Sequence, residues 1–293
     1  MISIDRPLRF LSSIYPTMAV FYSDNEFLLC AVKYKTPFTY IVCNPVTKQW
    51  ITLPEPRGHC QYNENVLLHV YNVDELCSKT TTQFMVMCFI KEPNDLLQVE
   101  LYCSKKGKWN KPKLCYYSSR LKEIDCITYF KGSAYWIHDE RQIAVYGLKE
   151  ESVGFVELSP DIRLSAGLGV SAGVLYFIET TPKCFQVWVF ENGAEFSLKH
   201  SIEFESFKER SPSHLYREGF TFHLMGFHPL DYQLVLVKCN DKVALYHMDK
   251  RSLEVVDDMN DIWELWTLVW LLQGLPLLSS SVAYLHSLQK EHQ

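Results

Sequence analysis

The strongest constraint on the fold of this chain is a pattern of short segments that repeats along most of its length. In each segment apolar residues run together or alternate with polar ones, and Gly, Pro, Asn, Asp or Ser bounds it, which is typical of β-strands. Five times, an apolar residue near the end of one segment is followed seven residues later by another apolar residue across a polar turn. The pairs are Cys43 with Trp50, Tyr102 with Trp109, Tyr146 with Val153, Val189 with Phe196 and Tyr246 with Leu253.

These pairs recur about every 51 residues on average, close to the ~50-residue period of kelch repeats. A four-stranded twisted sheet cannot bury both of its faces alone, whereas sheets stacked around an axis bury them against one another. We therefore expect an all-β fold, a kelch-like β-propeller of about six four-stranded blades. It would form a single domain over residues 1–293, with repeats from about residue 20 to residue 288. A β-sandwich is the alternative, since it is also built from short strands.

Residues 261–273 have helical rather than strand periodicity. Trp263, Trp266 and Trp270 share one face of the short C-terminal helix that this spacing predicts. We expect this face to pack over the seam of the barrel, and the alternative is a face for a partner helix. The overlapping apolar stretch 262–278 is 17 residues long and contains Glu264 and Pro276. A membrane span needs about 20 predominantly apolar residues, so we expect no contact with a membrane.

Composition narrows the function classes. Hydrophobic residues make up 47% of the chain and charged residues 22%, as in globular proteins, and the net charge of −5 argues against a nucleic-acid partner. The ten cysteines include no C-x-x-C pair, and the first ten residues lack the apolar core of a signal peptide. We expect free thiols and a cytoplasmic or nuclear location, or both.

Motifs that resemble catalytic signatures favour ordinary structure. Gly169, Ser171 and Gly173 form a G-x-S-x-G sequence, but a strand follows it where a nucleophile elbow requires a helix, so it predicts a tight turn. His223 and His228 lack partners at metal-binding spacing. The acidic pairs Glu150–Glu151 and Asp257–Asp258 do not predict a carboxylate dyad, and the basic cluster at residues 105–108 (KKGK) does not predict a nucleic-acid patch. We therefore expect no catalytic, cofactor-binding or metal-binding residues.

Several segments together resemble one family. The sequence NPVTKQWITLP at residues 44–54 resembles the first repeat of the plant F-box-associated domain, and four further segments resemble that domain in the same order. They are residues 23–30 (SDNEFLLC), 130–137 (FKGSAYWI), 143–160 and 283–288 (AYLHSL). The resemblance implies a kelch-related propeller and a non-enzymatic protein-interaction module, similar to the substrate-recognition part of F-box subunits of SCF ubiquitin ligases.

The sequence departs from that family's usual organisation at its N-terminal end. No segment before Ser23 resembles the F-box that docks on the ligase adaptor, so we expect no adaptor docking by this chain. Two alternatives stay open: a kelch-type propeller enzyme, either an oxidase or a glycan hydrolase, and a non-catalytic decoy module.

The partner is expected on the propeller face that carries the loops between blades. These loops are residues 54–65, 111–125, 159–165 and 205–219. Surface loops on a rigid scaffold concentrate binding residues, and Tyr and Arg dominate interface hot spots. The candidate partner-binding residues are Arg57, His59, Tyr62, Tyr116, Tyr117, Arg120, Arg210, His214, Tyr216 and Arg217.

Overall fold

A computed structural model describes most of the chain between residues 8 and 258. The described residues are 8, 10, 11, 13–24, 27–32, 39–56, 66–75, 79–91, 96–110, 115–117, 125–139, 142–158, 166–180, 183–191, 193, 195–204, 222–227, 231, 233–239 and 242–258.

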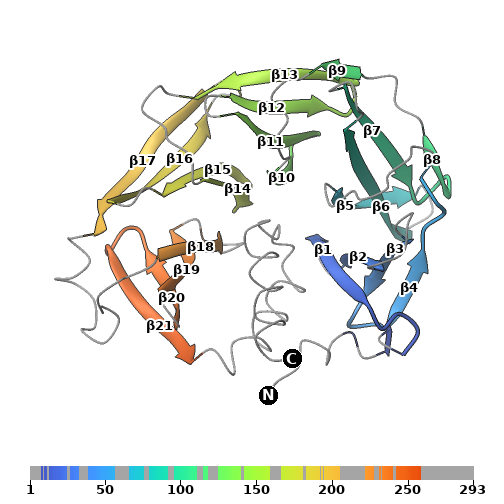
Figure 1. Cartoon of the computed structure of the whole chain (residues 1–293), viewed down its shortest axis with the longest axis horizontal. Helices are drawn as coiled ribbons and strands as arrows, with labels where there is room; N and C mark the ends of the chain where they lie inside the picture. The colour runs from blue at the N-terminus through green and yellow to red at the C-terminus, as the bar shows by residue number, and fades with distance from the viewer. Residues whose placement is uncertain are drawn as a thin grey trace.

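Within these residues the strands form five sheets, each built on a four-stranded meander in which every strand pairs antiparallel with the next. Figure 1 shows the five sheets side by side around a common centre, as the blades of a propeller, with β1, β5, β10, β14 and β18 innermost. Each innermost strand contacts the innermost strand of the following blade, from β1 to β5 and onward to β18. The all-β propeller expected from the repeat is therefore confirmed, and the β-sandwich is not.

The five blades are numbered in chain order. Blade 1 consists of β1 (Met18–Asp24), β2 (Phe27–Val32), β3 (Thr39–Asn44) and β4 (Gln49–Thr52). Blade 2 consists of β5 (Val66–Glu75), β6 (Lys79–Lys91), β7 (Leu96–Cys103), β8 (Lys108–Asn110) and the added β9 (Cys115–Tyr117), which pairs with β7. Blade 3 consists of β10 (Asp125–Phe130), β11 (Ser133–Asp139), β12 (Gln142–Gly147) and β13 (Ser152–Glu157). Blade 4 consists of β14 (Ala166–Ser171), β15 (Val174–Thr180), β16 (Cys184–Glu191) and β17 (Glu195–Glu203). Blade 5 consists of β18 (Phe222–Phe227), β19 (Leu234–Cys239), β20 (Lys242–His247) and β21 (Ser252–Asp258).

The prediction of about six blades is corrected to five among the described residues. A tally of about 20 predicted strands fits five blades as well as six, and the described strands form five. The helix expected at residues 261–273, with Trp263, Trp266 and Trp270, lies outside the described residues.

The seven-residue spacing found in the sequence corresponds to the outer hairpin of each blade. Cys43 is paired with Trp50, and the same register holds for the pairs that begin at Tyr102, Tyr146 and Tyr246. In all four hairpins the residue five positions after the first member has a positive φ, which reverses the chain direction. These residues are Lys48, Gly107, Glu151 and Arg251.

Blade 4 departs from this rule. Val189 pairs with Ser197, and Phe196 pairs with Phe190, so the predicted pairing of Val189 with Phe196 is wrong by one residue. The physical reason is a shorter connection, because Glu191 pairs directly with Glu195 and Gly193 has the positive φ. A slip of one residue moves a side chain to the opposite face of a strand.

The core consists of apolar layers between successive blades. One layer joins blades 1, 2 and 3, a second joins blades 3 and 4, and a third joins blades 4 and 5. The remaining face of blade 1 is covered from within the N-terminal segment, where Leu8 and Leu11 pack on Leu28, Cys30 and Ile41. Each described blade is thereby fixed through large buried surfaces, which makes the assembly a rigid platform.

Candidate interaction surfaces

The meander order defines two faces of the propeller. Because strand direction alternates, the connections between blades emerge on the same side as the connection between the second and third strands of each blade. We call this side the joining face, and the side with the outer hairpins the hairpin face. For example, β4 ends at Thr52 and β5 begins at Val66, so the two strand ends on either side of the first joining segment lie on the joining face.

Most of the predicted partner-binding residues lie outside the described residues. These are Arg57, His59, Tyr62, Arg120, Arg210, His214, Tyr216 and Arg217. The backbone of Tyr116 and Tyr117 is described, and it corrects one expectation: the segment 111–125 is not entirely loop. It contains β9, in which Tyr116 is opposite Leu97 and Tyr117 is opposite Leu96 of β7.

Trp109 connects blade 2 to blade 1. Its indole Nε1 donates a hydrogen bond to the backbone carbonyl of Pro54, with a length of 2.6 Å, at the start of the first joining segment. The indole ring also contacts Tyr40 of blade 1 and Tyr102 of blade 2. A buried tryptophan needs such an acceptor for its N–H, so this bond holds the first joining segment against blade 2.

His200 and Tyr246 form a second connection, between blades 4 and 5. The His200 Nε2 lies 2.7 Å from the Tyr246 hydroxyl oxygen, and the Tyr246 ring packs against Phe185. Burial, followed by the positive charge of Arg251, lowers the pKa of His200 below its ordinary value. The neutral imidazole is therefore the form that this contact favours.

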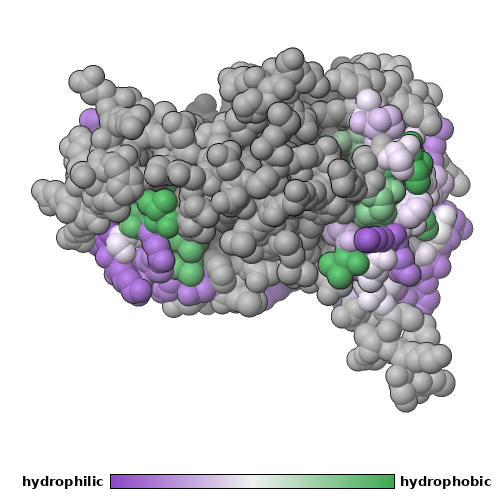
Figure 2. Space-filling model, turned by 90° about the horizontal axis from the view of Figure 1, so that it is seen from below, coloured by the Kyte–Doolittle hydropathy of each residue, from purple (hydrophilic) through white to green (hydrophobic). Residues whose placement is uncertain are grey.

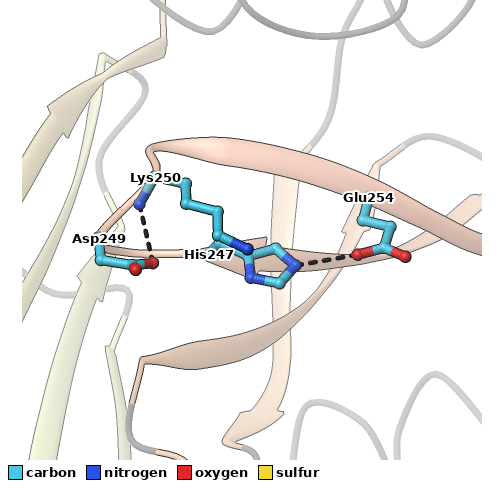
Figure 3. A network of polar contacts seen from close by, with 4 residues as sticks. All are labelled: His247, Asp249, Lys250 and Glu254. Carbon is cyan, nitrogen blue, oxygen red and sulfur yellow. Dashed lines mark hydrogen bonds and ion pairs between the residues drawn. The ribbon is translucent and has the colours of Figure 1, made fainter.

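The hairpin face of blade 5 carries a small polar network, shown in Figure 3. His247 at the end of β20 lies with its Nε2 3.0 Å from the Glu254 Oε2 of β21, and the Lys250 amide donates to the Asp249 carboxylate at 2.8 Å. Both contacts are local to one hairpin, and Glu254 is largely exposed. Pairs of this kind stabilise a turn but contribute little to binding.

Blade 1 exposes three large hydrophobic side chains in its outer hairpin, whereas the outermost strands of blades 3 and 4 expose one each, Phe155 and Leu198. Val46 is 61% exposed, Trp50 43% and Ile51 45%. Ile14, which belongs to the N-terminal segment, is 50% exposed. Figure 2 shows hydrophobic residues at the surface among hydrophilic ones on the side of the molecule where blade 1 lies. We call residues 46–52 with their backbone edge the β4 edge. Sequence reasoning missed it, because its only signal is the lack of charged residues between Lys48 and Glu55.

The N-terminal segment lies against one side of the β4 edge. The rings of Phe10 and Trp50 are 5.8 Å apart, and the hydroxyl groups of Tyr15 and Thr52 are 3.0 Å apart. These contacts hold β4 in place without burying Trp50 or Ile51.

The remaining motifs take structural positions. Ser171 is buried and pairs with Val174 across a two-residue turn, in which Ala172 and Gly173 both have positive φ. The tight-turn interpretation of G-x-S-x-G is thus confirmed. Residues 105–108 form an exposed hairpin tip, as expected. Glu150 and Glu151 are exposed in another hairpin rather than on a strand, and Asp257 and Asp258 end β21.

Two searches of the described residues gave negative results. In the described parts of the chain no three His, Cys, Asp or Glu side chains come together as a metal site would require. No helix within the described residues has the length and hydrophobicity to cross a membrane.

Comparison with known proteins identifies the family. The family model described as "F-box protein At3g26010-like, beta-propeller" matches residues 10–271. The chain belongs to this family of F-box protein β-propellers. The family assignment confirms the resemblance seen in residues 44–54, and the matched range begins within the N-terminal segment that packs on blade 1.

One curated relative and two solved structures are also similar to this chain. F-box protein At5g07610 of Arabidopsis thaliana is 24% identical in an alignment of 239 positions that covers 72% of this chain. The chain covers 56% of that relative's length. The structure "YCF48 bound to D1 peptide" is matched with a TM-score of 0.46 at 7% identity, over 78% of this chain and 63% of the other. The computationally designed Ika8 protein is matched with a TM-score of 0.42 at 11% identity, over 83% and 62%. Structural likenesses of this size carry no weight for function.

Proposed function

We propose that the chain is a non-enzymatic protein-interaction module, which recognises a partner protein as the substrate-recognition propeller of an F-box ubiquitin ligase does. The observation that carries this proposal is the combination of the family with a well-packed platform that exposes hydrophobic side chains. Val46, Trp50 and Ile51 are exposed together on one blade, although the same blade buries Leu29, Cys30 and Ile41 almost completely. Exposed hydrophobic residues concentrated on one strand and its hairpin are consistent with an interaction site.

The joining face is the proposed main docking surface. The candidate partner-binding residues predicted on this face are Arg57, His59, Tyr62, Tyr116, Tyr117, Arg120, Arg210, His214, Tyr216 and Arg217. The described turns of the hairpin face are short, and those at residues 105–108 and 249–251 are charged, whereas the turn of blade 1 exposes Val46. The proposed setting is a reducing compartment, the cytoplasm or the nucleus, since buried thiols such as Cys30 and Cys88 suit it.

The experiment is to capture partners of the purified full chain from plant extract, and then to titrate the leading partner, purified separately, in a calorimeter. We expect saturable 1:1 binding to the folded chain and none to a heat-denatured sample. A chain that binds no purified partner, or that oxidises alcohols or hydrolyses glycans catalytically, contradicts the proposal.

A further inference from the structure

Strand β4 itself carries no charged residue, unlike the other outermost strands of the described blades, and exposed Lys48 directly precedes it. Strands at the edge of a sheet expose unpaired backbone groups, and charged side chains on them discourage pairing with other chains. No charged residue occurs in β4 (Gln49–Thr52), whereas each of the other four outermost strands carries at least one. The charged residues are Lys108 in β8, Glu157 in β13, Glu195, Lys199 and Glu203 in β17, and Glu254, Asp257 and Asp258 in β21.

The backbone of β4 is oriented to accept another strand. The Leu53 amide donates a hydrogen bond to the Tyr40 carbonyl at 2.9 Å, and Ile51 is opposite Val42 in the same register. Hydrogen-bonded and non-bonded pairs alternate in antiparallel sheets, so the N–H and C=O groups of Trp50 and Thr52 point away from β3. Among the described residues these outward groups have no backbone partner.

Side chains on both sides of this edge would be covered by an added strand. Ile51 lies on the side of Val42, whose side chain packs towards blade 2, and Trp50 lies on the opposite side against Phe10. Ile51 and Trp50 are 45% and 43% exposed, so each has apolar surface left to bury. An edge that offers both backbone groups and apolar flanks is the arrangement used in β-strand addition.

The ends of the edge select the direction of such a strand. Exposed Lys48 precedes β4 and exposed Glu55 follows it. In an antiparallel arrangement the incoming strand has its N-terminal end near Glu55 and its C-terminal end near Lys48. A basic residue at the first position and an acidic residue at the last would complement these charges.

We propose that the β4 edge binds an extended segment of a partner protein as an antiparallel fifth strand of blade 1. The segment has a neutral centre rich in β-branched residues, a basic residue at its N-terminal end and an acidic residue at its C-terminal end. The proposal rests on the proposed protein-binding function and names a second surface for it. A partner peptide is favoured over a second copy of this chain, because a four-residue edge between two rigid propellers buries much less than the ~1,000 Å² that a stable dimer needs.

The test uses the full chain and a fluorescein-labelled heptapeptide, Lys-Val-Thr-Val-Thr-Val-Glu, measured by fluorescence anisotropy. The variant Ile51→Lys places a charge on the edge, and Leu198→Lys is the matched control, because Leu198 has the same 45% exposure on the outermost strand of blade 4. We expect saturable binding that Ile51→Lys weakens at least tenfold and Leu198→Lys leaves within twofold. Exchanging the two terminal residues of the peptide should also weaken binding.

Hydrogen exchange distinguishes strand addition from simple hydrophobic contact. Saturating peptide should slow exchange at the amides of Trp50 and Thr52, which point outward, more than at residues of β17. The proposal is overturned by a peptide that does not saturate, by equal effects of the two lysine variants, or by a concentration-dependent dimer that Ile51→Lys abolishes. If a captured partner binds Ile51→Lys as tightly as the unaltered chain, the edge proposal fails while the proposed function stands.

Discussion

Cys30 and Cys43 lie on neighbouring strands of blade 1 with both thiols buried. A hydrogen bond with the Cys43 thiol, together with burial, raises the pKa of the Cys30 thiol well above its ordinary value. Because the thiolate is the reactive form, Cys30 should be inert in the folded chain. Maleimide labelling at pH 8 followed by mass spectrometry should find Cys30, Cys43 and Cys88 unmodified in the folded protein. After denaturation without reductant, all ten cysteines should react. Rapid labelling of Cys30 in the folded chain, or two or fewer reactive thiols after denaturation, contradicts this prediction.

His200 gives the chain a pH-dependent contact between blades 4 and 5. Its pKa is lowered in the folded state, so the unfolded state binds a proton more readily. The contribution of His200 to stability is therefore present above its unfolded pKa of about 6.5 and is lost as the pH falls through that value. The fall in melting temperature from pH 7.5 to pH 5 should be smaller for His200→Gln than for the unaltered chain. His247→Gln is the control, because His247 directly follows Tyr246 at the end of β20. An identical fall for His200→Gln and the unaltered chain excludes His200 as a source of the acid sensitivity.

Trp109 tests the hydrogen bond that links blade 2 to the first joining segment. Trp109→Phe keeps an aromatic ring but removes the donor to the Pro54 carbonyl. Loss of that part-buried bond should cost about 0.5–1.5 kcal/mol of unfolding free energy. Trp50→Phe is the matched control, because Trp50 is 43% exposed and donates no such bond among the described contacts, so it should change stability little. Equal effects of the two substitutions in urea unfolding would contradict the role given to Trp109.

At the scale of elements, the outer hairpins follow one backbone design with different residues at its strained position. Lys48 and Gly107 occupy equivalent positions with φ of 58° and 61°. A side chain there costs roughly 1 kcal/mol, because Cβ crowds the backbone in the left-handed region. Lys48→Gly should stabilise the chain by up to about 1 kcal/mol, and Gly107→Ala should destabilise it by a similar amount. A Cβ on Gly107 meets no atom within 4 Å, so steric packing does not explain that loss. Effects of the same sign for the two substitutions would show that the hairpins do not share this design.

The elements also show what sequence patterns reveal. Inner and middle strands such as β2 and β19 were predictable, because their residues are mostly apolar and their described central residues are buried. Outermost strands such as β4 and β8 are short, at four and three residues, and partly exposed, so they give almost no periodic signal beyond one tryptophan each. The register of blade 4 was missed because a shorter connection changes pairing without changing the apolar pattern around Val189 and Phe196.

At the scale of the whole molecule, the repeat identified the architecture but not the blade count. The spacing between equivalent residues varies with the joining segments, and a mean period cannot separate a long joining segment from part of an additional blade. The candidate site, too, could be predicted from the sequence only in part. Loop composition predicts a binding face and candidate residues such as Arg120 and Tyr216, which lie outside the described residues, while the exposed edge at Trp50 and Ile51 is found only from burial and pairing in three dimensions.

The most direct test of the central claim, that this propeller is a protein-binding module, is calorimetric titration of the captured partner against alanine variants of the joining face. Arg120→Ala, Arg210→Ala, Tyr216→Ala and Arg217→Ala are the variants, and substitutions in the hairpins at residues 105–108 and 249–252 are the controls. Hot spots among the four should cost about 2 kcal/mol or more each, roughly a thirtyfold loss of affinity, while the hairpin controls bind normally. Four neutral alanine variants, with binding abolished by the hairpin substitutions, would contradict this prediction.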